Sequence, residues 1–367
     1  MKKRLLIVVT LPPPVHGSNM MNQHVADYMT PNAEFDVEIL PLHYARSIKD
    51  IGIPRPEKIL LFITYWFKLI RTLHRFRPHV VYFSVVARNL PFFRDCFYVL
   101  LMKLYKARIV YHLHMKGIRE RTRNPLSRSI YQWAFDNESI ILLSPILYQD
   151  IDHLVDPAHT FYVANGIPQP KMNGDAVKKT SSPVPKILFL SNLVISKGPF
   201  TLLKACQLLK DKGYKFQVDF VGNPAGSTGK NQFERLIKNG GLDTYVNLPG
   251  PKYNGEKDQV LSNADIFVFP SRDECFPLVL LEAMSHGLPV ISTYEGAIPE
   301  IIDSGRTGFL VEKQDPVALA DKIAWLIDHP EERKHMGQAG LQKYLSHYTL
   351  EHFQKNIANV LQTISDK

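Results

Sequence analysis

Short apolar segments alternate with longer segments of helical pattern along this chain, and this alternation restricts the fold more than any other feature. The apolar segments are rich in Val, Ile, Phe and Tyr, which favour strands buried on both faces of a parallel sheet. In the first half the predicted strands are residues 4–10, 36–40, 79–84, 108–113, 139–143 and 160–164. In the second half they are residues 186–191, 215–221, 245–248, 265–269, 289–292 and 309–311. The pattern predicts an α/β fold of doubly wound, Rossmann-like sheets.

A break in the alternation predicts two domains. Residues 168–185 are rich in turn formers and lack apolar periodicity, so we expect them to form a linker. The length of 367 residues is also more than a single core usually organises. We therefore predict one domain over 1–167, a second over 186–345, and a final helix over 346–367. Two such domains would face a central cleft, with ligands bound outside the carboxyl ends of the strands.

The positive charge of the chain is concentrated in its first half. The net charge is +9, and residues 1–165 carry 21 Lys and Arg against 13 Asp and Glu. This excess suits a phospholipid surface, a phosphorylated substrate or nucleic acid, with an ordinary solvated face as the alternative. The helices expected at 57–76 and 90–106 combine aromatic, aliphatic and basic residues. They would either lie on an anionic membrane surface or pack on the core with a basic edge in solvent.

Simple counts exclude several classes of protein. The three cysteines, Cys96, Cys206 and Cys275, are far apart and follow no zinc-ligand spacing, which argues against a disulfide framework or a zinc site and fits a reducing cytoplasm. The longest apolar stretch, 59–67, is shorter than the ~20 residues of a transmembrane helix. The apolar run at the N-terminus ends in three prolines without a cleavage site, so it predicts a strand rather than a signal peptide.

Two motifs resemble known sites but lack the required context. Asp150-Ile-Asp152 has the spacing of a metal-binding Asp-x-Asp, and we expect it on a surface helix. Residues 222–230 resemble a phosphate-binding loop, but the spacing of the glycines and the lysine does not fit.

Two loops that follow predicted strands carry residues suited to binding an anion. The first ends at Gly17, where a helix would begin and backbone amides could approach a ligand closely. The second, Lys197-Gly198-Pro199, places a cation at a helix start, where it suits a phosphate. A tight turn and a solvated lysine explain the same two loops equally well.

The stretch 264–300 holds the most informative polar residues. A buried strand would be followed by a loop that carries Glu274, and then by a helix that Pro277 opens and Gly287 closes. Glu282 lies in that helix among Leu, Val, Ala and Met, where a carboxylate is costly unless a polar group binds it. The vicinal hydroxyls of a ribose would satisfy this carboxylate.

The two glutamates and their surroundings resemble the Glu-x7-Glu signature of the family 4 retaining glycosyltransferases, which have the GT-B fold. The match continues through Gly296-Ala-Ile-Pro-Glu300 and Gly305-Arg-Thr-Gly308. Further landmarks of the family occur in order, namely Pro14 to Gly17, Arg77-Pro78, His114, Ser144, Asn165-Gly166 and Lys197-Gly198. The resemblance covers nearly the whole chain, and it implies that the C-terminal helix crosses back to the first domain.

The resemblance implies a role for each matching residue. Glu282 would hold the nucleotide ribose, Glu274 would face the donor sugar, and Lys197 would neutralise the diphosphate. The implied catalytic residues are Glu274, His114 and Lys197. The implied donor-binding residues are Gly17, Asn192, Lys197, Glu274, Phe276, Leu278, Val279 and Glu282. The implied acceptor-side residues are His16, His114 and Lys116, and neither a metal ion nor another cofactor is implied.

Three positions depart from the family pattern. Asn192 stands where arginine is common, so one of two usual cations on the diphosphate is missing. Pro277 replaces a glycine and removes one backbone donor, although the amides that follow it remain. Met115, directly after His114, replaces a small or acidic residue and affects the acceptor side.

The resemblance implies a metal-independent, retaining transferase of the hexosyl or N-acetylhexosaminyl type. It would move a sugar from a nucleotide-diphosphate donor, with UDP favoured over GDP, to a saccharide or lipid-linked acceptor. Together with the basic first half, this suggests a cytoplasmic protein, peripheral at the inner face of the cell membrane, in cell-surface polysaccharide or glycolipid biosynthesis. The alternative is a non-catalytic nucleotide-sugar-binding GT-B protein. No recognition motif supports binding to nucleic acid.

Overall fold

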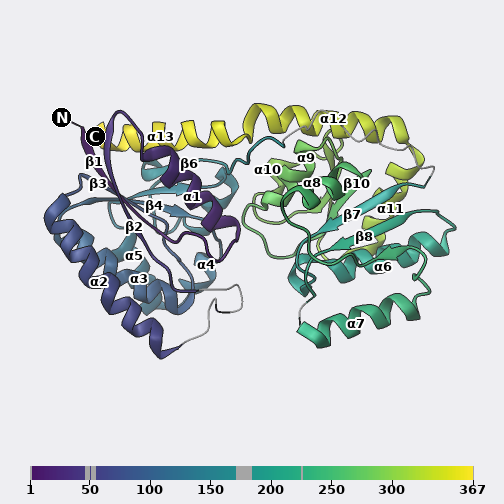
Figure 1. The fold of residues 1–367 in the computed structure, drawn as a ribbon, viewed down its shortest axis with the longest axis horizontal. Coiled ribbons are helices and arrows are strands. Elements are labelled where there is room, and N and C mark those ends of the chain that lie inside the picture. The colour runs from purple at the N-terminus through teal and green to yellow at the C-terminus, as the bar shows by residue number, and fades with distance from the viewer. Residues whose placement is uncertain (1, 46–49, 51–54, 171–183, 225, 367) are drawn as a thin grey trace. The chain divides into compact units, whose positions relative to one another are not determined.

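A computed structural model describes residues 2–45, 50, 55–170, 184–224 and 226–366. The chain divides into two compact units: the first comprises residues 1–165 and 350–367, and the second comprises residues 166–349. Each unit contains one six-stranded sheet in which all neighbouring strands are parallel (Figure 1). The linker expected at 168–185 falls mostly on 171–183, which lie outside the described residues.

The sheet of the first unit has the strand order β2-β1-β3-β4-β5-β6. Its strands are β1 (Lys3–Val9), β2 (Phe35–Pro41), β3 (Val80–Phe83), β4 (Arg108–Leu113), β5 (Ser139–Leu142) and β6 (Thr160–Tyr162). Each strand lies within two residues of its predicted segment. The agreement is close because strands buried on both faces of a sheet appear in the sequence as continuous apolar runs. The order reverses between β1 and β3, and ligands of such sheets bind beside the loops at this point.

Helices cover both faces of the first sheet (Figure 1). They are α1 (Gly17–Met29), α2 (Pro56–Phe76), α3 (Asn89–Leu104), α4 (Ile118–Arg121), α5 (Pro125–Phe135) and α13 (Leu350–Asp366). The two helices predicted at 57–76 and 90–106 are thus confirmed as α2 and α3. The C-terminal helix α13 packs along α1 within this unit, and Lys3 Nζ donates to Ser365 O at 2.5 Å.

The sheet of the second unit has the order β12-β11-β10-β7-β8-β9, which is typical of the Rossmann fold. Its strands are β7 (Lys186–Leu190), β8 (Gln217–Val221), β9 (Val246–Asn247), β10 (Ile266–Phe269), β11 (Val290–Thr293) and β12 (Gly308–Val311). Its helices are α6 (Pro199–Asp211), α7 (Gly226–Asn239), α8 (Asn254–Ser262), α9 (Leu278–Ser285), α10 (Ile298–Ile301), α11 (Pro316–Asp328) and α12 (Pro330–His347). The strand order reverses between β7 and β10, which are direct neighbours.

The longest apolar stretch of the sequence, 59–67, lies inside α2. Among the described parts of the chain, no helix combines the length and the apolar composition that a membrane crossing needs.

Candidate active site

Two ionisable residues meet where the second sheet reverses its strand order. Lys197 ends a short 3-10 turn, Ile195–Lys197, after β7, and Glu274 lies in the loop after β10. Lys197 Nζ lies 2.5 Å from Glu274 Oε1. The backbone joins the same two loops, because the Arg272 N–H donates to Ser196 O at 2.7 Å. The fold therefore brings together two predicted site residues that are 77 positions apart in the sequence.

Gly198 determines where Lys197 can lie. Its φ is +81°, in the left-handed region that favours glycine. A Cβ atom at this position would lie 2.0 Å from Pro270 O, so the turn after β7 packs directly on the backbone at the end of β10. The glycine that the sequence pattern placed beside the lysine thus allows the two loops to touch.

The carboxyl of Glu274 is mostly buried, with 15% of the side chain exposed. Burial raises its pKa above the usual range, and the neighbouring charge of Glu295 acts in the same direction. The charge of Lys197 and its hydrogen bond oppose this rise. Lys197 therefore favours the ionised form of Glu274 against the effect of burial.

A second acid–lysine pair supports the backbone of Glu274. Glu295, which follows β11, is 3% exposed, and its Oε1 accepts the Glu274 N–H at 3.3 Å. Its Oε2 lies 2.7 Å from Lys313 Nζ. Gly296 packs so closely that an added Cβ would lie 2.3 Å from Glu274 O. Our sequence reasoning missed Glu295 and Lys313, although an acid directly after a buried strand was an available signal.

Glu282 lies on α9, in its second turn, as the sequence predicted. Its Oε1 accepts from Lys257 Nζ of α8 at 2.7 Å. The side chain of Glu282 is 22% exposed, so it is only partly desolvated. A bound ligand is therefore not the only group that can satisfy this carboxylate, because a lysine of the same chain already donates to it.

Of the remaining expected donor-side residues, Leu278 and Val279 begin α9 and Phe276 lies just before it, whereas Gly17 begins α1 in the first unit. The first-turn amides of Leu278 and Val279 precede the first intrahelical hydrogen bonds, and the N-cap Pro277 has no N–H. Phe276 is buried and its ring packs edge-on against Tyr348, so only its backbone is available to a ligand. Asn192, in the loop after β7, is exposed.

The residues expected on the acceptor side lie in the first unit, near the switch in its strand order. His16 is the N-cap residue of α1, which begins at Gly17, and its Nδ1 lies 3.1 Å from Ser18 Oγ. Burial lowers the pKa of His16 below its usual value. His114 and Lys116 follow β4, and both are half-buried.

His114 has an unusual environment. Part of its side chain is exposed, yet both ring nitrogens are buried without a hydrogen-bond partner among the described residues. Burial lowers its pKa to about 3, and the nearby His16 contributes in the same direction. The ring of His112 lies 4.1 Å away, centroid to centroid, and Tyr82 Oη is 2.5 Å from His112 Nδ1. Sequence reasoning missed His112, although residues i and i+2 of a strand share a face.

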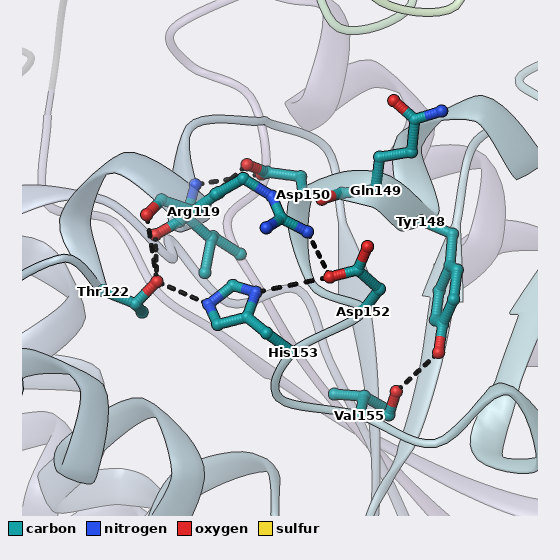
Figure 2. A network of polar contacts seen from close by, with 9 residues as sticks. Arg119, Thr122, Tyr148, Gln149, Asp150, Asp152, His153 and Val155 are labelled. Atoms are coloured by element: carbon teal, nitrogen blue, oxygen red, sulfur yellow. Dashed lines mark hydrogen bonds and ion pairs between the residues drawn. The ribbon is translucent and has the colours of Figure 1, made fainter.

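The carboxylate of Asp150 binds the backbone at the start of α4, and Figure 2 shows Asp150 beside Arg119. Asp150 accepts the backbone N–H groups of Gly117, Ile118 and Arg119 at 2.8, 2.9 and 2.9 Å. Arg119 also forms an ion pair with Asp152. Asp150-Ile-Asp152 was expected on a surface helix; Asp150 ends a 3-10 helix and Asp152 is exposed, but Asp150 also caps the start of α4, which was not expected.

Comparisons with known proteins show what the chain is similar to in sequence and in fold. Residues 175–343 match the family model described as glycosyl transferases group 1. This segment contains Lys197, Glu274 and Glu282, whereas His16 and His114 lie outside it.

Three curated relatives illustrate the sequence similarity. The "Putative colanic acid biosynthesis glycosyltransferase WcaL" of Salmonella typhimurium is 29% identical over 207 residues, which are 54% of this chain and 50% of the relative. The D-inositol 3-phosphate glycosyltransferase of Corynebacterium efficiens is 34% identical over 159 residues, 42% of this chain and 38% of the relative. The amylovoran biosynthesis glycosyltransferase AmsK of Erwinia amylovora is 31% identical over 191 residues, 50% of this chain and 46% of the relative. The matched residues thus span half or less of the length of these relatives.

Solved structures extend the likeness to nearly the whole chain. A glycosyltransferase from Rickettsia africae has a TM-score of 0.80 at 17% identity, covering 99% of this chain and 98% of that one. HepE from Anabaena, in complex with UDP, has a TM-score of 0.78 at 16% identity, with 99% and 100% covered. The sucrose-phosphate synthase of Thermosynechococcus elongatus has a TM-score of 0.76 at 17% identity, with 99% of both chains covered. Residues 175–343 are thus similar in sequence to the group 1 glycosyl transferases, and the chain has the α/β fold of the GT-B glycosyltransferases.

Proposed function

We propose that this protein is a family 4 retaining glycosyltransferase that moves a sugar from a nucleotide-diphosphate donor to an acceptor hydroxyl. The observation that carries this proposal is the Lys197–Glu274 pair at the switch point of the second sheet, with Glu282 on the adjoining helix α9. Carboxylates for a sugar and a ribose, and a cation for a diphosphate, are the groups that such a donor requires. The family likeness supplies the stereochemistry of the transfer.

The chemical difficulty of the transfer is the negative charge on the departing diphosphate. The bond from the anomeric carbon to the diphosphate oxygen breaks, and the acceptor hydroxyl oxygen bonds to the same face of that carbon. The hydroxyl proton passes to the leaving diphosphate. Lys197 would stabilise this charge together with the first-turn amides of α9, so the proposed reaction needs no metal ion.

UDP is the nucleotide that we favour, with GDP as the second choice. HepE, which shares the fold, has been crystallised with UDP and with UDP-glucose, and this supports a uridine nucleotide. Glu282 would accept hydrogen bonds from the ribose, and Glu274 would bind hydroxyls of a hexosyl or N-acetylhexosaminyl group. Gly17, Asn192 and Phe276 complete the proposed donor set.

We assign the acceptor side to His16, His114 and Lys116, and the acceptor itself to a saccharide or a lipid-linked saccharide. Two of the relatives are named for colanic acid and amylovoran biosynthesis, which supports a role in cell-surface polysaccharide assembly. A lipid-linked acceptor would bring the protein to the inner face of the cell membrane as a peripheral protein.

A non-catalytic nucleotide-sugar-binding protein is the second candidate. Asn192 supplies no cation to the diphosphate, and Pro277 supplies no amide. Both departures remove a group that would contact the diphosphate. Turnover separates the candidates, because a binding protein would be stabilised by the nucleotide yet would not release it from its sugar conjugate.

A thermal-shift panel with UDP, GDP, ADP and CMP tests the donor site first. A nucleotide at 100 times its Kd should add about 2.7 kcal/mol to the free energy of unfolding. We expect UDP to stabilise the wild type most, and Glu282→Gln to reduce this shift. Glu256→Gln is the matched control, because Glu256 forms an exposed pair with Lys252. Equal responses to all four nucleotides, or an unchanged response in Glu282→Gln, would contradict the proposal.

A further inference from the structure

Helices α2 and α3 carry large apolar side chains on their solvent side as well as on their buried side. The exposed residues, which we call the apolar face, are Ile59, Leu60, Ile63 and Phe67 of α2 and Leu90, Phe93, Phe97, Leu100 and Leu104 of α3. Phe67 is 65% exposed and Leu104 is 68% exposed. Elsewhere on the described surface, many of the exposed large hydrophobic residues occur singly. The main group of such residues lies on α2 and α3.

The spacing on α3 turns these residues into one continuous stripe. Positions 90, 93, 97, 100 and 104 alternate in steps of three and four, which places them on one side of an α-helix. The opposite side of α3 is also apolar, and there Phe92, Tyr98, Val99 and Met102 are fully buried in the core of the unit. A surface helix needs only one apolar side to pack on a core, so packing on the core does not account for the most exposed residues of the outer stripe, Leu90 and Leu104.

Aromatic rings join the stripe of α3 to the exposed residues of α2. The ring of Phe97 lies 5.7 Å from that of Phe62 and 6.0 Å from that of Trp66, centroid to centroid. Ile63 follows Phe62 in the chain, and Phe67 follows Trp66. Ile63 and Phe67 therefore lie on the adjoining side of α2. The two helices run beside one another in the first unit (Figure 1), so their exposed residues form one surface.

Positive charge accompanies this apolar face. Lys68 and Arg71 on α2 and Lys106 after α3 are exposed, and the described residues contain no ion pair to any of the three. The acidic residues within α2 and α3 are Glu57, at the start of α2, and Asp95, which is buried against Arg94. Arg71 lies one turn beyond Phe67 on the same side of α2, so a cation continues the apolar stripe.

We propose that the apolar face of α2 and α3 docks on the surface of an anionic phospholipid bilayer. Aromatic and aliphatic side chains would enter the boundary between head groups and acyl chains, while the flanking cations contact lipid phosphates. A second copy of this chain is a poorer occupant, because a symmetric dimer would place the same cations against one another. The inference rests on the peripheral membrane location in the proposed function and deepens it by naming the surface that contacts the lipid, and its test needs no nucleotide.

Cosedimentation with vesicles tests this docking directly. We expect the wild type to bind vesicles of equimolar phosphatidylglycerol and phosphatidylcholine at low salt, more weakly at high salt, and least with phosphatidylcholine alone. The variant Phe67→Glu/Leu104→Glu should bind at least about tenfold more weakly, because two charges would enter the interface. Val317→Glu, which changes a residue 56% exposed in the second unit, should bind as the wild type does.

Three further readings complete the test. The melting temperature shows whether the double variant is folded, and if it is not, the exposed single variant Arg71→Glu should still weaken vesicle binding. Failure of the wild type to sediment with phosphatidylglycerol vesicles would overturn the proposal, as would equal binding by the folded double variant. A wild-type dimer in solution that the double variant abolishes would instead identify a second copy as the occupant. Retained stabilisation by UDP in any of these cases leaves the donor proposal intact.

Discussion

The two units treat their candidate site residues in opposite ways. In the second unit, each of the three carboxylates is already paired with a lysine of the same chain, as Lys197–Glu274, Lys313–Glu295 and Lys257–Glu282. In the first unit, His114 has two buried ring nitrogens without a partner among the described residues. The difference teaches that the candidate site residues of the second unit are held in place by charges within the chain, whereas His114 of the first unit is an uncharged group without such a partner among the described residues.

Removing Lys197 should have the largest effect on the second unit. In Lys197→Ala, the cation proposed for the diphosphate is lost, and we expect turnover to fall about 10²–10³-fold, on the order of 3–4 kcal/mol in the transition state. Turnover of a UDP-sugar measures this effect. Lys212→Ala is the control, since it breaks only the exposed pair with Asp321. Activity of Lys197→Ala within about threefold of the wild type would remove Lys197 from the catalytic set.

Gly198→Ala should show how tightly the two loops of the second unit are packed. The alanine would have to adopt a left-handed conformation and would also meet Pro270 O, so we expect a loss of at least about 2 kcal/mol in the free energy of unfolding. Gly213 has a similar φ of +83° with nothing within 4 Å of an added Cβ. Gly213→Ala should therefore cost only about 1 kcal/mol. Urea unfolding of both variants gives the comparison, and equal losses would mean that the close approach at Gly198 is unimportant.

Changes at Glu295 separate the charge of this residue from its hydrogen bond. Glu295→Ala should cost about 1–3 kcal/mol, because the Glu274 N–H loses its acceptor and Lys313 loses its partner. The partial exposure of Lys313 keeps this cost at the lower end. Glu295→Gln keeps an acceptor for the backbone and should recover part of the stability and most of the turnover. If glutamine behaves as alanine does, the charge rather than the hydrogen bond positions Glu274.

The smallest expected effect is the change in the free energy of unfolding when His114 of the first unit is titrated with acid. The pKa of His114 is about 3 in the folded protein and ~6.5 when unfolded, so the unfolded state binds more protons between these values. Stability should therefore fall as the pH drops below ~6.5, by at most about 1.4 kcal/mol per pH unit from this residue. His114→Asn should flatten the stability profile between pH 6 and 4 relative to the exposed control His335→Asn. An unchanged slope would show that His114 is protonated, or that the site opens, above pH 4.

The fold was predictable because its strands are buried on both faces. Segments such as Ile266–Phe269, where each residue is buried, read as unbroken apolar runs, and their order along the chain indicates parallel sheets. The pairing of Lys197 with Glu274 was accessible for the same reason, because each follows a strand and carboxyl ends of parallel strands meet at one edge. The roles of these residues were left open by spacing, and they are proposed from the likeness to a known family.

The supporting residues were not predictable, because their pairing depends on elements distant in the sequence. Lys257 lies on α8 and reaches Glu282 on α9 only through the packing of the second unit. Asp150 binds the loop after His114 from 33 positions further along the chain. His112 resembles any core residue of β4 in the sequence, and only its contact with Tyr82 and the ring of His114 sets it apart.

The Lys257–Glu282 pair has a further consequence for how a nucleotide would be recognised. A glutamate that is already held by a lysine occupies one rotamer before any ligand arrives, so a ribose would meet an ordered acceptor. Ordering such a side chain during association costs about 0.5–1.5 kcal/mol of conformational entropy. To the extent that Lys257 holds Glu282, we expect this cost to be met in folding rather than in binding. Lys257→Ala should therefore make the entropy of UDP binding less favourable in calorimetry, even where the contacts to the ribose survive.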